Sequence, residues 1–353
     1  MTLARAVWRI RRAGSLGRLA LCREPVAEPG PGEARVRVEA IGLNFADLFA
    51  CQGLYSATPQ GSFIPGLECA GTIEALGPGF PSETDLRIGD RVVALTRFGA
   101  YATVVNVGAG LLRRVPAGWS AAQAAAWPVQ GLTAWYGLIP LGAVARGDVV
   151  LVQSAAGGVG LQAIAMLQTL GARPLAVVGQ ESKRRFLIEQ RGLAPETVIV
   201  RDQRHLANQL DAGLAALGTQ GFDCVLDAVL GPGFRPSFER LCPEGRYVLF
   251  GAADFMTASA RPNYLRLAFD YLRRPRVDPL AMISANRSLM AFNLIWLWNH
   301  AERLPEAYRQ LEALAPLPPH IGAVLPFERA PEAMRLLQAG GTIGKVVLEV
   351  GGG

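Results

Sequence analysis

The sequence predicts an α/β protein in which a β-rich N-terminal domain precedes a doubly wound parallel sheet. Between about residues 35 and 112, short apolar runs alternate with turn residues, as in a small β domain or distorted barrel. From residue 148 onward, apolar strands alternate with helical segments, which is typical of a parallel sheet. A glycine-rich turn joins the first strand of this second part to its first helix.

The composition agrees with a globular protein that has a large interior. Of the 353 residues, 50% are hydrophobic and 18% are charged, which excludes disorder as the main state. Domains usually hold about 100–200 residues, so the length predicts two of them. The net charge of +6 comes with scattered arginines, which disfavours nucleic acid as a partner. Five cysteines without a C-x-x-C pair indicate a reducing compartment, and we expect a cytoplasmic protein.

The N-terminal elements are expected to be short strands. Residues 5–10 and 16–21 form two of them around Gly14. The alternative for this arginine-rich, acid-free start is a transit peptide, but its two apolar runs favour folded structure. Further strands are expected at residues 35–39, 70–76, 91–95 and 101–105.

Residues 115–145 lack any charge, which raises the question of a transmembrane helix. Pro128 and Pro140 interrupt the stretch, and four glycines lie between residues 118 and 142. Two buried helices at a domain junction explain this pattern better than a membrane span does.

The second part begins with a βαβ unit. We expect strands at residues 148–152 and 174–178, with a helix at 161–170 between them. The alternation continues with strands at 197–200, 223–227 and 246–250 and helices at 206–217 and 234–241. Near the end, residues 331–337 predict a helix and residues 345–350 a strand that returns to the first domain.

The turn between the first strand and helix has the composition of a dinucleotide-binding loop. Glycines let the backbone approach a pyrophosphate, and the helix start offers unpaired N–H groups and a positive dipole end. Because the turn follows an apolar strand and opens a helix, we favour this function over a merely tight turn. The residues expected to contact the cofactor here are Ala156, Gly157, Gly158, Val159 and Gly160.

The end of the second strand indicates which dinucleotide binds. An NAD enzyme usually places an acid there for the ribose 2′-hydroxyl, and Glu181 is such an acid. However, Ser182, Lys183 and Arg184 supply donors and positive charge for a 2′-phosphate, so NADPH is favoured. The alternative is that this charge run is a solvated first turn of a helix.

Several motifs stand in order along the chain: Gly42-Leu-Asn-Phe-Ala-Asp47, Gly53-Leu-Tyr55, Pro65-Gly-Leu-Glu-Cys-Ala-Gly71, Gly89-Asp-Arg-Val92 and the glycine-rich turn. Together they resemble one family, the zinc-free quinone oxidoreductase branch of the medium-chain dehydrogenase/reductase superfamily. Phe292-Asn-Leu-Ile-Trp-Leu297 is similar to its vesicle-amine-transport-like members.

The resemblance implies a GroES-like domain at residues 1–126, a Rossmann domain at 127–295 and a segment at 296–353 that rejoins the first domain. It also implies a homodimer that pairs edge strands of the Rossmann sheets, with residues 288–294 as the candidate. An interior strand is the other interpretation of that apolar stretch.

The resemblance also bears on metal chemistry. Zinc-dependent relatives use a cysteine near the position of Asn44 and a histidine where this chain has Leu67, and neither residue here is a suitable zinc ligand. No metal site is expected. Without zinc to polarise an alcohol, we expect hydride transfer from NADPH to a quinone or an α,β-unsaturated carbonyl.

Two residues are expected to act in catalysis. Asn44 resembles a family asparagine near the nicotinamide ribose, although an isolated asparagine is more often a turn former. Tyr55 matches a tyrosine that protonates the product in related enoyl reductases; a phenol near an enolate oxygen can act as a general acid. The competing interpretation of Tyr55 is a pocket wall, which suits quinones because they can take protons from solvent.

Further cofactor contacts follow from the resemblance. Thr133 resembles a threonine near the nicotinamide, with a helix-start hydroxyl as the alternative, and Gly251 and Lys345 match segments that pass the cofactor. Arg201 stands where relatives place a tyrosine on the 2′-phosphate, and it either replaces that contact or is simply exposed. The three histidines, His205, His300 and His320, are expected at the surface.

The sequence therefore predicts an NADPH-dependent, zinc-independent oxidoreductase. The alternatives are a dedicated 2-alkenal or enoyl reductase and a non-catalytic NADPH-binding relative that is structural or binds RNA. Only two of the 35 basic residues, Lys183 and Lys345, are lysines, and both fall at expected cofactor positions.

Overall fold

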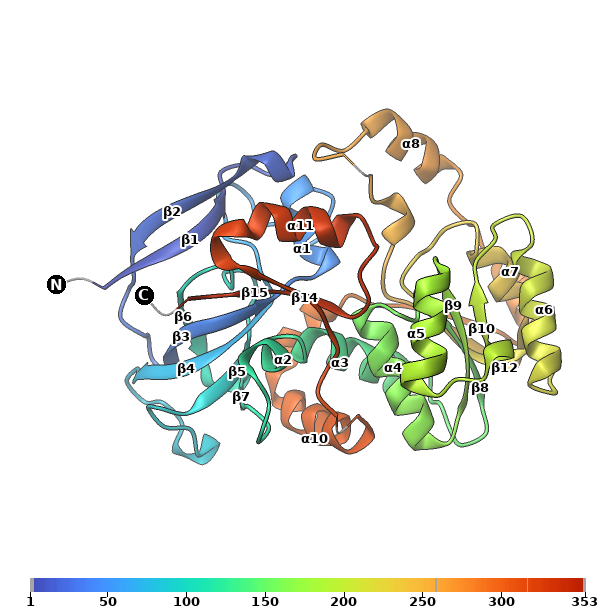
Figure 1. Cartoon of the computed structure of the whole chain (residues 1–353), viewed down its shortest axis with the longest axis horizontal. Coiled ribbons are helices and arrows are strands. Elements are labelled where there is room, and N and C mark those ends of the chain that lie inside the picture. The colour runs from blue at the N-terminus through green and yellow to red at the C-terminus, as the bar shows by residue number, and fades with distance from the viewer. Residues whose placement is uncertain (1–2, 258, 316, 352–353) are drawn as a thin grey trace.

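The computed structural model of the chain describes residues 3–257, 259–315 and 317–351. Its strands form two large sheets and one two-stranded sheet. Figure 1 shows the mixed N-terminal sheet on the left and the parallel sheet on the right, with helices α2 (Ala121–Ala125), α3 (Pro128–Tyr136) and α4 (Gly158–Leu170) between them.

The N-terminal sheet has seven strands in the order β14-β15-β3-β4-β5-β7, with β6 paired to β3. Its last strand, β15, pairs antiparallel with β3 and parallel with β14, so the C-terminal strands complete the sheet that the N-terminal strands begin. The domain boundaries at residues 126 and 295 stay a prediction. The strands are β3 (Glu33–Gly42), β4 (Glu68–Leu76), β5 (Arg91–Leu95), β6 (Val104–Gly108), β7 (Leu112–Arg114), β14 (Ile321–Pro326) and β15 (Lys345–Glu349).

A separate antiparallel pair, β1 (Ala4–Ile10) and β2 (Leu19–Pro25), packs against this sheet. The second strand begins later than expected because residues Leu16–Arg18 form a 3-10 turn. The Ser15 hydroxyl caps this turn by accepting the Gly17 N–H, a local bond that competes with the strand.

The second large sheet is wholly parallel, with the strand order β10-β9-β8-β11-β12-β13. Numbered from β8, this is the order 3-2-1-4-5-6 of the Rossmann fold, which confirms the predicted fold class. The strands are β8 (Val149–Gln153), β9 (Arg173–Val178), β10 (Val198–Val200), β11 (Phe222–Asp227), β12 (Leu241–Leu249) and β13 (Ser288–Ala291).

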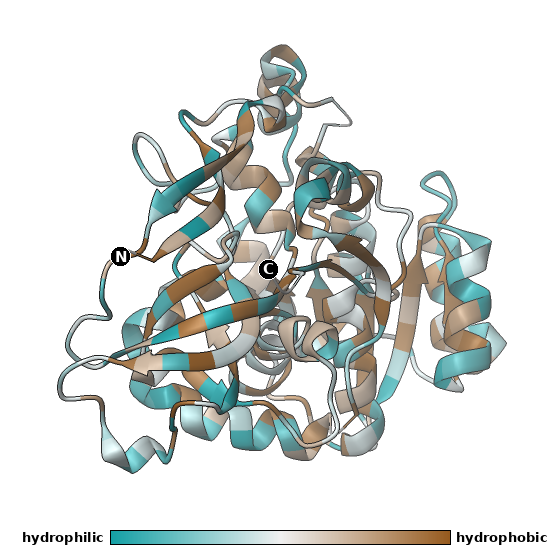
Figure 2. Cartoon of the chain, turned by 60° about the vertical axis from the view of Figure 1, so that its left-hand side comes forward, coloured by the Kyte–Doolittle hydropathy of each residue, from teal (hydrophilic) through white to brown (hydrophobic). Residues whose placement is uncertain are grey.

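Both faces of this sheet are covered, which explains why its strands are continuously apolar. Alternate residues of a strand point to opposite faces. Val150 and Val152 of β8 belong to the hydrophobic cluster that includes α3 and α4, whereas Val149 and Leu151 belong to the cluster on the opposite face. Figure 2 shows the peripheral helices with alternating hydrophilic and hydrophobic bands, as expected for helices packed on one side. The remaining helices are α1 (Phe45–Gln52), α5 (Glu181–Arg191), α6 (Leu206–Ala216), α7 (Phe234–Glu239), α8 (Tyr264–Leu272), α9 (Pro279–Ala285), α10 (Leu304–Leu314) and α11 (Ala330–Gln338).

The uncharged stretch 115–145 contains two helices, α2 and α3, and both are largely buried. Pro128 lies in the first turn of α3, where its missing N–H costs nothing. Pro140 does not separate two helices, because α3 continues into a π-helical turn, Gly137–Leu141, that contains it. None of the described helices is both long and apolar enough to cross a membrane.

Candidate functional site

The carboxyl ends of the parallel strands bring most predicted cofactor residues to one edge of the sheet. The glycine-rich turn follows β8, Ser182 and Lys183 follow β9, Arg201 follows β10, and Gly251 follows β12. Backbone bonds fix their spacing: Ala155 N–H donates to the Val177 carbonyl at 3.0 Å, and Arg201 N–H donates to the Val178 carbonyl at 2.9 Å. Ligands of doubly wound sheets bind at this edge.

The glycine-rich turn leaves the start of α4 open. Ser154 begins the turn with φ at 56°, a left-handed conformation that only a few non-glycine residues adopt. At Gly160, a Cβ would lie 2.5 Å from the Ala155 carbonyl oxygen, so only glycine fits. No side chain caps the N-terminus of α4 at Gly157. The first N–H groups of α4, including that of Val159, therefore suit an anion.

Residues 340–345, which we call the closing turn, lie beside the glycine-rich turn. Gly344 N–H donates to the Ala156 carbonyl at 2.9 Å, and Gly344 forms an isolated parallel bridge with Gly157. Gly344 has φ at 72°, and a Cβ there would lie 2.3 Å from the His320 carbonyl oxygen. The Lys183 ammonium donates to the Gly340 carbonyl at 2.6 Å. The closing turn thus contacts two separate parts of the predicted cofactor site.

The closing turn ends in a buried ion pair. The Lys345 ammonium donates to Glu68 Oε1 at 2.5 Å and to Asn44 Oδ1 at 2.7 Å. Asn44 in turn donates through Nδ2 to Glu68 Oε1 at 2.9 Å, and Glu68 Oε2 accepts the Val129 N–H at 2.7 Å. Lys345 is 1% exposed and Glu68 is fully buried, so each charge depends on the other for compensation. Burial lowers the pKa of Lys345, which the Glu68 charge opposes.

Asn44 and Asp47 form a capping box at the start of α1. The Asn44 N–H donates to Asp47 Oδ2 at 2.8 Å. Tyr101 donates its hydroxyl to the same oxygen at 3.3 Å, and Oδ1 is buried without a partner among the described residues. Because Asp47 is fully buried, loss of solvation raises its pKa to about 7.

The residues predicted to bind a 2′-phosphate differ in their exposure and in the hydrogen bonds that they already make. Ser182 is exposed in the first turn of α5, and Lys183 is partly buried beside it. The Arg184 guanidinium is occupied, because it bonds Glu181 at 3.1 Å and the carbonyls of Val198 and Pro195 at 3.0 Å. The Glu181 carboxylate is therefore directed to a neighbouring arginine. These roles stay predictions.

Arg201 lies near two carboxylates. Its positive charge lowers the pKa of Asp227 and of Asp254, although burial raises the pKa of both overall. Asp227 is itself held by the Tyr247 hydroxyl at 2.7 Å and the Val229 N–H at 2.7 Å. Gly251 packs against the loop that follows β11, because a Cβ at Gly251 would lie 2.6 Å from the Ala228 carbonyl oxygen.

Tyr55 lies on the N-terminal side of the site. Its hydroxyl donates to Asn293 Oδ1 at 2.6 Å, and its ring packs edge-on against Phe98. Burial raises the pKa of Tyr55 to about 12, so the phenol keeps its proton at neutral pH. Asn293 also donates to Ser56 Oγ at 3.3 Å, which fixes the amide.

Thr133 is buried within α3, and its hydroxyl donates to the Val129 carbonyl at 2.6 Å. The Val129 N–H bonds Glu68, so Thr133 lies one helical turn from the buried ion pair. The threonine oxygen can still accept a hydrogen bond, but its proton is already used.

Several residues of the site were not predicted from the sequence. Glu68 and Asn293 both stand in recognised motifs, but neither was assigned a role. Gln130 packs on the glycine-rich turn, since a Cβ at Gly158 would lie 1.8 Å from its Oε1. His205 and His300 are exposed, whereas His320 is partly buried and packs on Phe186, with ring centroids 4.7 Å apart.

The described residues contain no cluster that could hold a metal ion, taking a cluster as three or more side chains of histidine, cysteine, aspartate or glutamate. The Lys345 ammonium lies between the side chains of Asn44 and Glu68.

Two sequence families match the chain. Residues 30–131 match the alcohol dehydrogenase GroES-like domain, and residues 196–348 match a family described as zinc-binding dehydrogenase. The synaptic vesicle membrane protein VAT-1 homolog of Homo sapiens is 33% identical over 343 residues, which are 96% of this chain and 84% of that protein. The Danio rerio protein of the same name is longer, and this chain spans 64% of it.

Solved structures similar to this chain include oxidoreductases with the same two-domain fold. A mycobacterial protein in complex with NADPH superposes with a TM-score of 0.82 at 30% identity, covering 98% of this chain and 99% of that one. The quinone oxidoreductase from Thermus thermophilus, also solved with NADPH, gives 0.75 at 30% identity over the same shares. The CurK enoyl reductase gives 0.79 at 25% identity, again with 98% and 99% covered.

The chain belongs to the quinone oxidoreductase branch of the medium-chain dehydrogenase/reductase superfamily. This confirms the family that the sequence motifs indicated.

The buried ion pair gives a first prediction. Lys345→Met should lower the free energy of unfolding by about 3–5 kcal/mol, because Glu68 loses its compensating charge. Adding Glu68→Gln should restore part of this loss, since the double variant buries no net charge. Urea unfolding of the apo protein measures both.

Lys183→Met is the matched control for that prediction, because Lys183 has only a carbonyl partner among the described residues. Lys183→Met should lower the free energy of unfolding by only about 1 kcal/mol. Equal losses at the two lysines would contradict the importance of the ion pair.

Asp47 gives a second prediction. Its pKa of about 7 in the folded protein exceeds the unfolded value of about 3.9, so folding favours the protonated form. Stability should therefore fall as pH rises from about 4 to about 7 and then level off. Asp47→Asn keeps an oxygen for the Asn44 N–H and removes this contribution.

Urea unfolding at pH 5 and pH 8 tests it. Between pH 5 and pH 8, the free energy of unfolding of the wild type should fall by on the order of 2 kcal/mol relative to that of the Asp47→Asn variant. A difference between the two proteins that does not change with pH would show that Asp47 is ionised throughout.

Proposed function

We propose that this protein is an NADPH-dependent oxidoreductase that transfers hydride to a quinone or an α,β-unsaturated carbonyl without zinc. The observation that carries the proposal is the position of the Lys345 ammonium, bonded to Asn44 and Glu68. By family resemblance, Asn44 stands at a zinc-ligand position and Glu68 follows another, Leu67. An ammonium there repels a second cation, so the acceptor must already be electrophilic.

The residues at the sheet edge fit NADPH. The uncapped start of α4 suits the pyrophosphate, and Ser182 and Lys183 suit a 2′-phosphate. Arg184 bonds one oxygen of Glu181 and partly offsets its negative charge, which disfavours NADH. Two structural neighbours at 30% identity were solved with NADPH. When bound, this cofactor supplies the hydride.

Asn44 and Tyr55 have distinct roles in the proposal. The Asn44 amide is held by Lys345 and Glu68, which leaves one carbonyl lone pair for a ribose hydroxyl. Tyr55 holds a proton that it donates to Asn293, and it can turn that proton toward an enolate oxygen. A quinone needs less of this help because its reduced oxygens take protons from solvent.

A dedicated enoyl reductase is the second candidate, favoured by the likeness to the CurK enoyl reductase and by the protonated phenol of Tyr55. We also propose a homodimer through β13, which lies at the edge of the parallel sheet. Beyond that strand the sheet offers unpaired backbone groups to a second copy.

The acceptor is tested with a panel of quinones, enones and alkenals, following NADPH oxidation by wild type and Tyr55→Phe. The variant should lose about 10²–10⁴-fold in kcat on enones, the usual contribution of a general acid, and much less on quinones. Equal enone turnover by both proteins would exclude the acid role. If wild type turns over no member of the panel above background, the proposed function is wrong.

Cofactor preference is tested at Lys183. Lys183→Ala should weaken NADPH binding by about 10-fold, the order of one charge-assisted hydrogen bond, and leave NADH binding nearly unchanged. Titration of cofactor fluorescence measures both dissociation constants. Arg185→Ala, a neighbour on α5, is the control. Parallel losses for the two cofactors at Lys183 would place the 2′-phosphate elsewhere.

A further inference from the structure

Helix α8 exposes large apolar side chains at the surface. None of its nine residues is buried. Leu265, Phe269 and Leu272 are 87%, 55% and 67% exposed, although leucine and phenylalanine form much of the core elsewhere. Figure 1 shows α8 at the upper edge of the molecule, apart from both large sheets. A helix this short usually depends on the packing of an apolar face, and α8 buries no such face within the chain.

The exposed apolar residues form one stripe along α8. The stripe consists of Leu265, Ala268, Phe269 and Leu272, and all four are exposed. Their spacing of i, i+3, i+4 and i+7 places them on the same face of the helix. Asp270, on the other side of the helix, is partly buried. The helix therefore turns a polar side toward the protein and its apolar stripe outward, the reverse of a helix packed on a core.

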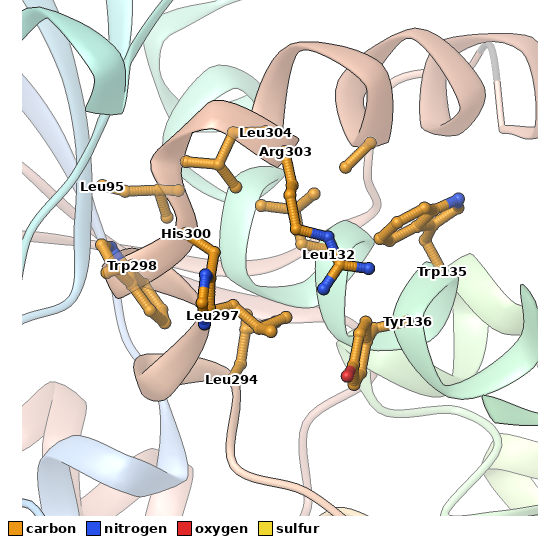
Figure 3. A pocket seen from close by; sticks show the side chains of 11 residues that line it. Leu95, Leu132, Trp135, Tyr136, Leu294, Leu297, Trp298, His300, Arg303 and Leu304 are labelled. Carbon is orange, nitrogen blue, oxygen red and sulfur yellow. The ribbon is translucent and has the colours of Figure 1, made fainter. Parts of the chain in front are cut away.

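Elsewhere the apolar side chains are closely packed. Between α3, α10 and the 3-10 segment Leu294–Arg303, the leucines and tryptophans leave a cavity of about 20 Å³, which is room for a single water molecule (Figure 3). The stripe of α8 has no comparable packing, so its apolar surface is available to a partner. Contiguous exposed apolar surface of this kind marks an interaction site.

A strong positive charge accompanies the stripe. Residues 261–276 contain five arginines and one aspartate, so this segment carries a net charge of +4, compared with +6 for the whole chain. Arg266 pairs with Asp270 at 3.4 Å, whereas the other four arginines have no carboxylate within ion-pair distance among the described residues. Their charge is therefore available to an anionic partner.

Two of these arginines lie on aromatic rings of the helix. The Arg273 guanidinium is 4.9 Å from the centre of the Phe269 ring, and the Arg274 guanidinium is 3.9 Å from the centre of the Tyr271 ring. These contacts hold positive charge at the border of the apolar stripe. A partner that covers the stripe therefore meets both apolar surface and cations.

The charge and the shape of this surface indicate its partner. A second copy of the chain is disfavoured, because two-fold pairing of α8 would bring together two segments of the same charge. The headgroups of an anionic bilayer suit the arginines, and the acyl chains beneath them suit the stripe. Because α8 is convex and lies at the outer edge of the molecule, a flat bilayer can reach it (Figure 1).

We propose that α8 docks this protein on an anionic lipid bilayer. The stripe enters the boundary between headgroups and acyl chains, and Arg273, Arg274 and Arg276 bind lipid phosphates. Burial of apolar surface and attraction between opposite charges both contribute to the affinity. The proposal does not depend on hydride transfer or on the cofactor.

Cosedimentation with vesicles tests the proposal. The vesicles consist either of phosphatidylcholine alone or of equal parts of phosphatidylcholine and the anionic lipid phosphatidylglycerol. The partition coefficient of the wild type should be at least about 10-fold higher on the mixed vesicles, and added salt should lower it by screening the charges.

Two double variants separate the contributions. Leu265→Ser with Phe269→Ser should lower the partition coefficient on mixed vesicles by about 10–100-fold, because two large apolar side chains are no longer buried in lipid. Arg273→Gln with Arg274→Gln should lower it by about 10–30-fold and remove most of the preference for phosphatidylglycerol. An unchanged melting temperature shows that each variant folds.

Matched controls change similar residues elsewhere. Ile88→Ser alters an apolar side chain that is 63% exposed in the turn before β5, and it should bind the mixed vesicles as the wild type does. Arg235→Gln with Arg309→Gln removes the same charge from two other helices and should have little effect.

The proposal is overturned if the wild type does not cosediment with the mixed vesicles, or if either α8 double variant binds them as tightly as the wild type. Light scattering tests the other occupant of the stripe. If Leu265→Ser with Phe269→Ser converts a larger assembly into a smaller one, the stripe joins copies of the chain and the proposal is wrong.

Discussion

The buried pair of Lys345 and Glu68 is the contact on which the arrangement of the site depends. It joins the last strand, β15, to β4, and through Glu68 it also holds the start of α3 at Val129. Asn44 completes the group and begins α1. Two charges taken out of water are expensive, and their attraction offsets this cost only when the geometry is well satisfied, as it is here.

This pair connects the two parts of the fold. Lys345 ends the closing turn, whose Gly344 bonds the glycine-rich turn of the parallel sheet. One short segment therefore contacts both the expected pyrophosphate site and the expected nicotinamide side. The same ammonium lies between Asn44 and Glu68, so it both compensates the Glu68 charge and holds the Asn44 amide.

The sequence by itself determined the fold class, the βαβ unit and the glycine-rich turn, because these depend on local periodicity and on the conformational freedom of glycine. It also predicted that both lysines contact the cofactor, which stays a prediction, and it assigned Lys345 no protein partner. Lys345 bonds residues that lie 277 and 301 positions away, and Tyr55 bonds one 238 positions away. Such pairings depend on the register of the N-terminal sheet and on the packing of its helices, which no local pattern encodes. Only the tertiary structure decided that an ion pair, and not a surface charge, stands at the centre of this site.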